Sequence, residues 1–182
     1  TGEVVEAITI DKSITVNNLT ASAPVTVTAD DVALNNAKIT VNQTATPAVT
    51  VPSSVTGFTM TNSEISADTG SGGNHTAVNI SAGGDITFTG NTISNLTYNG
   101  VEFSQSSAVN SLTISGNNFV NCDNNAISIY KVVDGAVINI ENNSFTNVSN
   151  AIRLSNYDNT TATFNISKNI ADTDNMWNKA FV

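Results

Sequence analysis

The sequence predicts an all-β solenoid, a right-handed, single-stranded parallel β-helix of about six coils, each of roughly 26 residues, with three parallel sheets. Three observations predict it: a phrase rich in β-branched residues, Thr and Asn returns at a constant period, each copy contains short strands, and no helical periodicity separates them. The phrase begins at Ile86, Leu112 and Ile138, which are equally spaced along the chain. A constant period of this length is typical of stacked repeats.

The first strand of each repeat has one apolar face and one polar face. Its apolar residues alternate with Thr, Ser, Asn or Glu, in the pairs Phe58/Met60, Ile86/Phe88, Leu112/Ile114, Ile138/Ile140 and Phe164/Ile166. Because successive side chains of a strand point to opposite faces, these pairs are predicted to fill the core. A further apolar position marks another short strand at Ile39, Ile65, Ile93, Phe119 and Phe145.

The remaining strand of each repeat follows a small residue. The phrases "AVTV" at Ala48, "AVNIS" at Ala77, "GVEFS" at Gly100, "AISIY" at Ala126 and "AIRLS" at Ala151 mark it. Such short strands with turns between them can be wound as a solenoid, in which each coil adds one strand to each sheet at a spacing of about 4.8 Å. The step from Ile14 to Val32 is shorter than the common period, which predicts an abbreviated first coil.

Two columns of asparagine recur with the coil period. One consists of Asn91, Asn117, Asn143 and Asn169, and the other of Asn95, Asn121 and Asn147. A stacked amide can donate a hydrogen bond to the coil on one side and accept one from the other side. Asn also tolerates the left-handed backbone conformation that tight turns require. The sequence therefore predicts asparagine ladders at the turns.

The repeats also carry a family resemblance. "GNTISNLTYNGVEFSQSS" and "GNNFVNCDNNAISIYK" resemble the repeats of the right-handed parallel β-helix superfamily, which includes pectate lyases, polygalacturonases, NosD-like periplasmic proteins and phage tailspikes. The resemblance covers about residues 4 to 182 and implies the fold, whereas enzymes and inert scaffolds share the repeat. We expect residues 1–182 to form a single domain that is a fragment of, or a module within, a larger protein, because neither end carries a capping segment.

Composition narrows the partners that we expect. Charged residues make up 12% of the chain, about half of the usual share, and the net charge is −9 with six Lys and Arg. We expect no nucleic-acid partner, because no basic stripe exists to neutralise phosphates. We expect no membrane insertion, because no apolar run approaches the roughly 20 residues of a membrane-spanning helix. The Asn- and Thr-rich, acidic composition favours an extracellular, cell-surface or virion-surface location.

The pattern of titratable residues predicts no catalytic, metal or cofactor site. The resemblance to pectate lyases would imply an acidic cluster that holds calcium, and glycoside hydrolysis needs two carboxylates at a groove. The outward column of the strands that follow the small residues reads Thr50, Asn79, Glu102, Ser128 and Arg153, with one acid and one base about 10 Å apart. Cys122 and His75 are the chain's single cysteine and histidine and have no recurring partner for nucleophilic or metal chemistry.

Long arms between strands are the candidate interaction loops. The arm from Phe58 to Ala77 is longer than the matching arms of the next two coils, so the segment that contains Asp68 and His75 is predicted to bulge outwards. Segments around Tyr157 and Trp177 are the other candidates. Their aromatic rings can stack on sugars or pack on a partner chain, and Trp177 can equally cap the last coil.

Taken together, these features favour a non-catalytic structural or adhesive module of a virion appendage, capsid, surface-layer or adhesin protein. Its expected partners are sister subunits or the rest of a larger assembly, and host surface glycans. The alternative is a fragment of a polysaccharide lyase or glycoside hydrolase whose catalytic residues lie elsewhere. A Thr-x-Thr array also suggests an ice-binding face, but only "TMT" and "TFT" follow that pattern.

Overall fold

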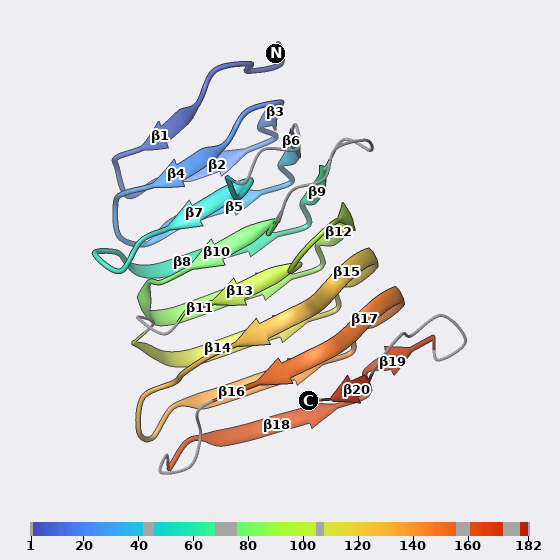
Figure 1. The fold of residues 1–182 in the computed structure, drawn as a ribbon. Helices are drawn as coiled ribbons and strands as arrows, with labels where there is room; N and C mark the ends of the chain where they lie inside the picture. The colour runs from blue at the N-terminus through green and yellow to red at the C-terminus, as the bar shows by residue number, and fades with distance from the viewer. Residues whose placement is uncertain are drawn as a thin grey trace.

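In the computed structural model, the described residues are 2–41, 46–67, 76–104, 108–155, 161–172 and 179–181. They form a parallel β-solenoid, and every strand pairing among them is parallel. Figure 1 shows the coils stacked from β1 at the N-terminal end to β18 at the other end. The described part of the chain contains no helix. The predicted fold class is confirmed.

Three sheet faces run along the solenoid. We call the first face sheet I, and it consists of β2 (Thr15–Asn17), β5 (Val32–Asn35), β8 (Thr56–Thr61), β11 (Gly83–Thr89), β14 (Val109–Ser115), β16 (Val137–Glu141) and β18 (Thr163–Ser167). Sheet II consists of β3 (Thr20–Ala21), β6 (Lys38–Val41), β9 (Glu64–Ala67), β12 (Thr92–Leu96), the first halves of β15 (Asn118–Ile129) and β17 (Ser144–Leu154), and β19 (Ile170–Ala171). Sheet III consists of β1 (Ile8–Ile10), β4 (Val25–Val27), β7 (Val49–Val51), β10 (Val78–Ile80), β13 (Val101–Phe103), the second halves of β15 and β17, and β20 (Lys179–Phe181).

Sheets II and III differ in one respect from the three separate sheets that the sequence predicts. In the later coils, the chain passes from sheet II to sheet III without leaving the strand conformation, so β15 is 12 residues long and β17 is 11. The two faces therefore form one hydrogen-bonded sheet of 13 strands beside the seven-stranded sheet I. A register shift between Cys122 and Asn125, opposite β17, marks the place where β15 bends.

The number of full-length coils is about five rather than six. Successive register partners in sheet I define these steps, namely Val32, Phe58, Ile86, Leu112, Ile138 and Phe164. Of these steps, the one from Phe58 to Ile86 is slightly longer than the others. The coil before them is shortened as predicted, because β2 pairs with β5 after a shorter stretch of chain, Thr15 with Ala33. The coil that begins with β18 is described in part.

The predicted apolar columns fill the interior, except that the last pair, Phe164 and Ile166, is only partly buried. Phe58, Ile86, Leu112 and Ile138 are buried, and so are the residues two positions further along each strand. The column of sheet II is buried as well, and its Phe119 and Phe145 rings stack with centroids 5.4 Å apart. Burial of such side chains contributes about 1.5–3 kcal/mol each, which makes the interior the main source of stability.

The first asparagine column forms a ladder that leaves no polar side-chain atom of its central members unpaired. Asn117 shows the pattern: its Nδ2 donates to Asn143 Oδ1 at 2.9 Å and to the carbonyl oxygen of Phe88 at 2.9 Å. Its Oδ1 accepts from both the backbone N–H and the Nδ2 of Asn91, at 2.9 and 3.0 Å. Asn143 makes the same contacts to Asn169, so the predicted ladder from Asn91 to Asn169 is confirmed.

The second asparagine column is an exposed ladder with the opposite polarity. Asn121 Nδ2 donates to Asn95 Oδ1 at 2.9 Å, and Asn147 Nδ2 donates to Asn121 Oδ1 at 2.8 Å. All three residues have positive φ, between 52° and 60°, as expected for Asn at such turns. The expectation is wrong for the first column, in which the residue before each ladder asparagine has the positive φ, for example Gly116 before Asn117.

Asn117→Ala should show how much the buried ladder contributes to the free energy of unfolding. The substitution leaves the Asn91 backbone N–H and Nδ2 and the Phe88 carbonyl without their buried partners. We expect a loss of about 2–4 kcal/mol in the free energy of unfolding, measured by urea denaturation. Asn121→Gly is the matched control, because it removes the exposed ladder amide and keeps the left-handed turn; its loss should be at most about 1 kcal/mol. Equal losses in the two variants would contradict the buried ladder's role.

Lys168→Asn should stabilise the protein. Lys168 is exposed and has a φ of 55°, a conformation that costs most side chains about 1 kcal/mol and that Asn adopts more readily. We expect a gain of about 0.5–1 kcal/mol, seen as a higher melting temperature and slower amide exchange in β18. Lys131→Asn is the control, because Lys131 is exposed but has no positive φ. If Lys131→Asn raises the stability as much as Lys168→Asn does, the effect comes from the loss of a positive charge and not from the backbone conformation.

Candidate functional site

The outer face of sheet III brings an acid, a hydroxyl and a base into one column. Glu102 of β13 and Arg153 of β17 are the register partners of Ser128 in β15, one rung to either side. Ser128 faces outwards because its neighbours Ile127 and Ile129 point into the core. We call the surrounding surface the Glu102–Arg153 strip; it comprises Tyr98, Asn99, Glu102, Ser128, Tyr130 and Arg153.

Arg153 is held by an aromatic ring rather than by an acid. Its guanidinium carbon lies 5.2 Å from the centre of the Tyr130 ring, within the range of a cation–π contact. Its Nη1 also donates to the Tyr130 hydroxyl, at a long 3.4 Å. A guanidinium carries several N–H donors in a planar fork, so most of them are available to a ligand or to solvent.

Ser128 is the anomalous residue of the strip. Its side chain is 0% exposed, and its hydroxyl has no hydrogen-bond partner within the part of the chain that the structure describes. Leaving a buried polar group unpaired costs about 1–3 kcal/mol. A residue in an outward column of a strand is expected to be solvated, so its burial indicates that neighbouring side chains cover it.

Glu102 is oriented by a third asparagine ladder that the sequence analysis missed. Asn99 Nδ2 donates to Glu102 Oε2, and Asn99 Oδ1 accepts from Asn125 Nδ2 at 2.8 Å. Asn150 Nδ2 continues the ladder to Asn125 Oδ1 at 3.0 Å. The sequence signal for this ladder was the separation of 26 residues between Asn99 and Asn125. The next step, from Asn125 to Asn150, is 25 residues because of the register shift in β15, so the ladder does not keep the constant coil period.

Tyr98 adds a protonated phenol to the strip. Partial burial raises the pKa of Tyr98 above its usual value of 10.0, and the nearby Tyr130 and Glu102 raise it further, whereas Arg153 lowers it. Because the pKa moves upwards, the phenol keeps its proton throughout the neutral range and remains a hydrogen-bond donor. Tyr98 shares a side-chain hydrogen bond with Tyr130, so the donors that the strip offers to a ligand are those of Tyr130, Ser128 and Arg153, beside a single carboxylate.

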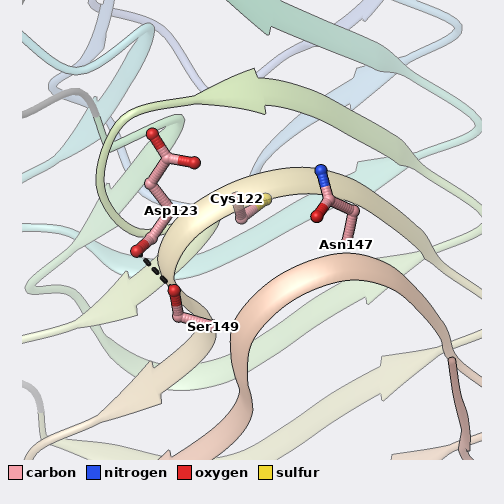
Figure 2. Close-up of a pocket in the computed structure, with 4 residues that line it drawn as sticks. All are labelled: Cys122, Asp123, Asn147 and Ser149. Atoms are coloured by element: carbon pink, nitrogen blue, oxygen red, sulfur yellow. Dashed lines mark hydrogen bonds between the residues drawn. The ribbon is translucent and has the colours of Figure 1, made fainter. Parts of the chain in front are cut away.

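A second candidate is a hollow of about 430 Å³ at the bends of β15 and β17, lined by Cys122, Asp123, Asn147 and Ser149 (Figure 2). Ser149 Oγ donates to the carbonyl oxygen of Asp123 at 2.7 Å, which ties the two bends together. The Cys122 thiol is buried, and this burial raises its pKa to about 12, with the nearby Asp123 adding to the shift. Cys122 therefore stays a thiol at neutral pH and lacks the thiolate that nucleophilic or metal chemistry requires.

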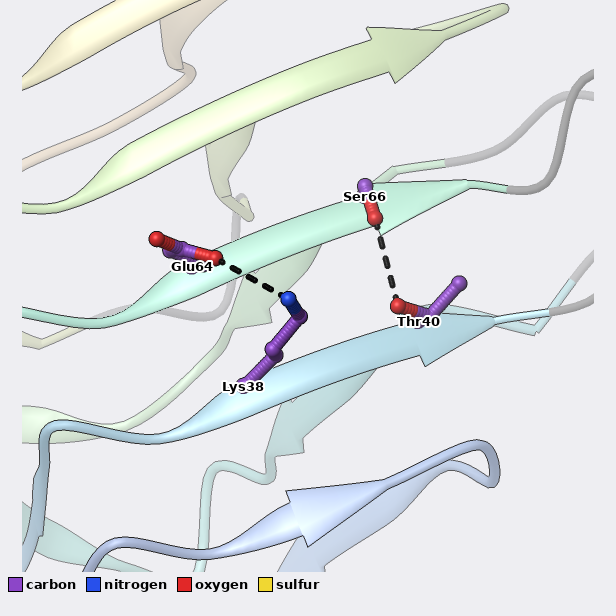
Figure 3. A network of polar contacts seen from close by, with 4 residues as sticks. All are labelled: Lys38, Thr40, Glu64 and Ser66. Atoms are coloured by element: carbon purple, nitrogen blue, oxygen red, sulfur yellow. Dashed lines mark hydrogen bonds and ion pairs between the residues drawn. The ribbon is translucent and has the colours of Figure 1, made fainter.

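The outer face of sheet II carries polar pairs between adjacent rungs (Figure 3). Lys38 Nζ lies 3.7 Å from Glu64 Oε2, and Thr40 Oγ1 lies 3.4 Å from Ser66 Oγ. Both members of the ion pair are about two-thirds exposed, so solvent screens their attraction. These contacts between β6 and β9 support the strand register and do not form a site.

The loop residues predicted to make contacts lie outside the described residues. Asp68, His75, Tyr157 and Trp177 all fall in this group, so their roles stay predictions. Among the residues that the structure describes, no group of three or more His, Cys, Asp or Glu side chains lies close enough together to hold a metal ion. The sequence places Glu102 and Arg153 two rungs apart on one sheet face. The structure shows that Tyr98 and Tyr130 lie beside them, which the sequence did not predict.

Comparisons with protein-family models, with curated proteins and with solved structures gave no match for this chain. Its description as a parallel β-solenoid therefore rests on the strand pairing, and the resemblance to one particular superfamily stays a prediction. Within the described ranges, no helix has the length and apolarity to cross a membrane.

Cys122 should be unreactive in the native protein. Because its pKa is raised to about 12, the thiolate fraction at pH 8 is lower than that of an ordinary thiol by a factor on the order of 1,000, and burial blocks access as well. We expect no release of the coloured product from Ellman's reagent until urea unfolds the chain, followed by one equivalent. The chain has a single cysteine, so the signal belongs to Cys122. Rapid reaction of the folded protein would contradict this environment.

Proposed function

We propose that this chain is a rigid, non-catalytic structural module of a larger extracellular, cell-surface or virion-surface assembly. One observation carries the proposal: the buried amide ladder runs from Asn91 to Asn169 with the same contacts in each coil, parallel to the stacking axis of the strands. A ladder of this kind makes every coil a support for the next and resists local opening. Such construction suits a module that holds surfaces at a fixed distance and orientation.

The surface of sheet I supports a role in contacts. Its outward residues form two columns of small polar side chains in register, among them Thr59, Thr87 and Thr113. These three threonines are partly exposed, and Glu141 is the charged residue of the two columns from β8 to β18, so most of this face offers hydroxyl and amide groups without a strong field. A flat array of this type fits sister subunits, or glycans whose hydroxyl groups can both donate and accept. We expect sheet I to adhere to these partners through many hydrogen bonds between neutral groups.

The enzymatic alternative has a defined test. The protein is incubated with polygalacturonate and with other acidic polysaccharides in the presence of calcium, and the unsaturated or reducing ends that appear are measured. We expect no release above that of a heat-denatured sample, because the described acid column holds one carboxylate, whereas hydrolysis needs a pair.

Glu102→Gln is the control that separates the protein's own activity from a contaminating enzyme. Release by the original protein that disappears in this variant would contradict the proposal and make Glu102 a catalytic residue. If both preparations release the same amount of sugar ends, and if a further purification step removes this activity from both, a contaminating enzyme is its source and the module is non-catalytic.

A further inference from the structure

We propose that the Glu102–Arg153 strip binds the carboxylate group of a ligand, which Arg153, Tyr130 and Ser128 hold through hydrogen bonds. The inference goes beyond the structural function, because a rigid module requires no ligand at this place. It starts from Ser128, whose buried hydroxyl has no partner in the described chain although it lies in an outward column. A buried, unpaired donor is stabilised as soon as an acceptor reaches it.

Arg153 supplies the charge that selects an anion. Its planar guanidinium matches a carboxylate in a two-bond arrangement, and its contacts with Tyr130 leave most of the N–H donors unused. Glu102 lies two rungs from Arg153 but only one rung, about 5 Å, from Ser128, so a carboxylate held by both Arg153 and Ser128 lies near a second negative charge. The Arg153 guanidinium must offset this repulsion, which favours a group with one negative charge over a group with two.

The donors around Ser128 match the acceptor sites of one carboxylate. Arg153 is the register neighbour of Ser128 on the next rung, and Tyr130 lies two residues along the same strand direction, so both side chains project from the same face. An ionised carboxylate has two oxygens with several acceptor positions. The guanidinium, the Tyr130 hydroxyl and the Ser128 hydroxyl together provide donors on one face of the sheet.

Binding requires one small rearrangement. The Arg153 Nη1 contact with the Tyr130 hydroxyl, at 3.4 Å, is near the limit of a hydrogen bond. A carboxylate that replaces this weak bond by two bonds to the guanidinium must also displace the side chains that cover Ser128. On the other side, the Asn99 ladder holds Glu102 in place, so the acidic end of the strip stays fixed.

The test is a titration of the 182-residue chain with sodium acetate, sodium glucuronate and glucose, monitored by the NMR shifts of the Ser128 and Arg153 amides and by calorimetry. We expect saturable binding of acetate and glucuronate, and no response to glucose at the same concentrations. If glucuronate binds more tightly than acetate, the site prefers the carboxylate of an acidic sugar. If the two bind equally, the site recognises the carboxylate alone. Both results support the site. No saturable response to either carboxylate, or an equal response to glucose, would overturn it.

Two variants examine the assignment of residues. Arg153→Met should weaken binding by about tenfold or more, because it removes the charge and keeps much of the side-chain length. Lys38→Met, which removes an exposed cation from sheet II, is its matched control and should leave binding unchanged.

Ser128→Ala is the decisive variant, because two readouts separate a ligand role from a structural one. If the Ser128 hydroxyl binds the ligand, the substitution should weaken carboxylate binding by about three- to tenfold. The unliganded variant should be at least as stable as the original protein, because the substitution removes an unpaired buried hydroxyl. A variant that is less stable in urea and binds with unchanged affinity would show that the hydroxyl serves the fold, and the proposal would fail.

Discussion

The structure depends on one constraint: parallel coils stacked in register place the same kind of side chain at the same place in every rung. The turn between sheets I and II shows the consequence most clearly. Its backbone turns away from the sheets, so its N–H groups need partners in the interior, and the ladder through Asn117 provides them from the next coil. Each amide is thus tied to a coil on either side, and the coils hold one another in place.

The same constraint leaves the outer faces open to variation. The inward columns are apolar within the strands and amide ladders at the turns, and they must fit their neighbours; for example, a Cβ atom on Gly100 would lie 2.4 Å from the carbonyl oxygen of Ala126 in the next coil. Outward columns have no such restriction, and they change from Thr50 and Asn79 to Glu102, Ser128 and Arg153 along a single sheet. A solenoid can therefore carry a localised chemical surface without altering its scaffold.

The sequence revealed the features that follow the strict coil period and missed those that break it. The inward columns and the ladders of Asn91 and Asn95 were predictable because spacing alone determines them. The ladder that starts at Asn99 was missed, since a register shift in β15 shortens one step to Asn150. Ser128 was predictable as an outward residue, but its burial depends on the rotamers of larger neighbours, which periodicity does not describe.

The irregular ladder and the Glu102–Arg153 strip are physically connected. Asn99 is the last amide of the ladder in this direction that the structure describes, and its spare N–H group is directed at Glu102 rather than at another asparagine. The acid is therefore part of the rigid framework. Arg153, in contrast, rests on the Tyr130 ring and has no acidic partner among the described residues, because Glu102 lies two rungs away. The Asn99 ladder holds the acidic end of the strip, whereas a ring contact and one long hydrogen bond to Tyr130 hold the guanidinium at the other end, which is the weaker attachment.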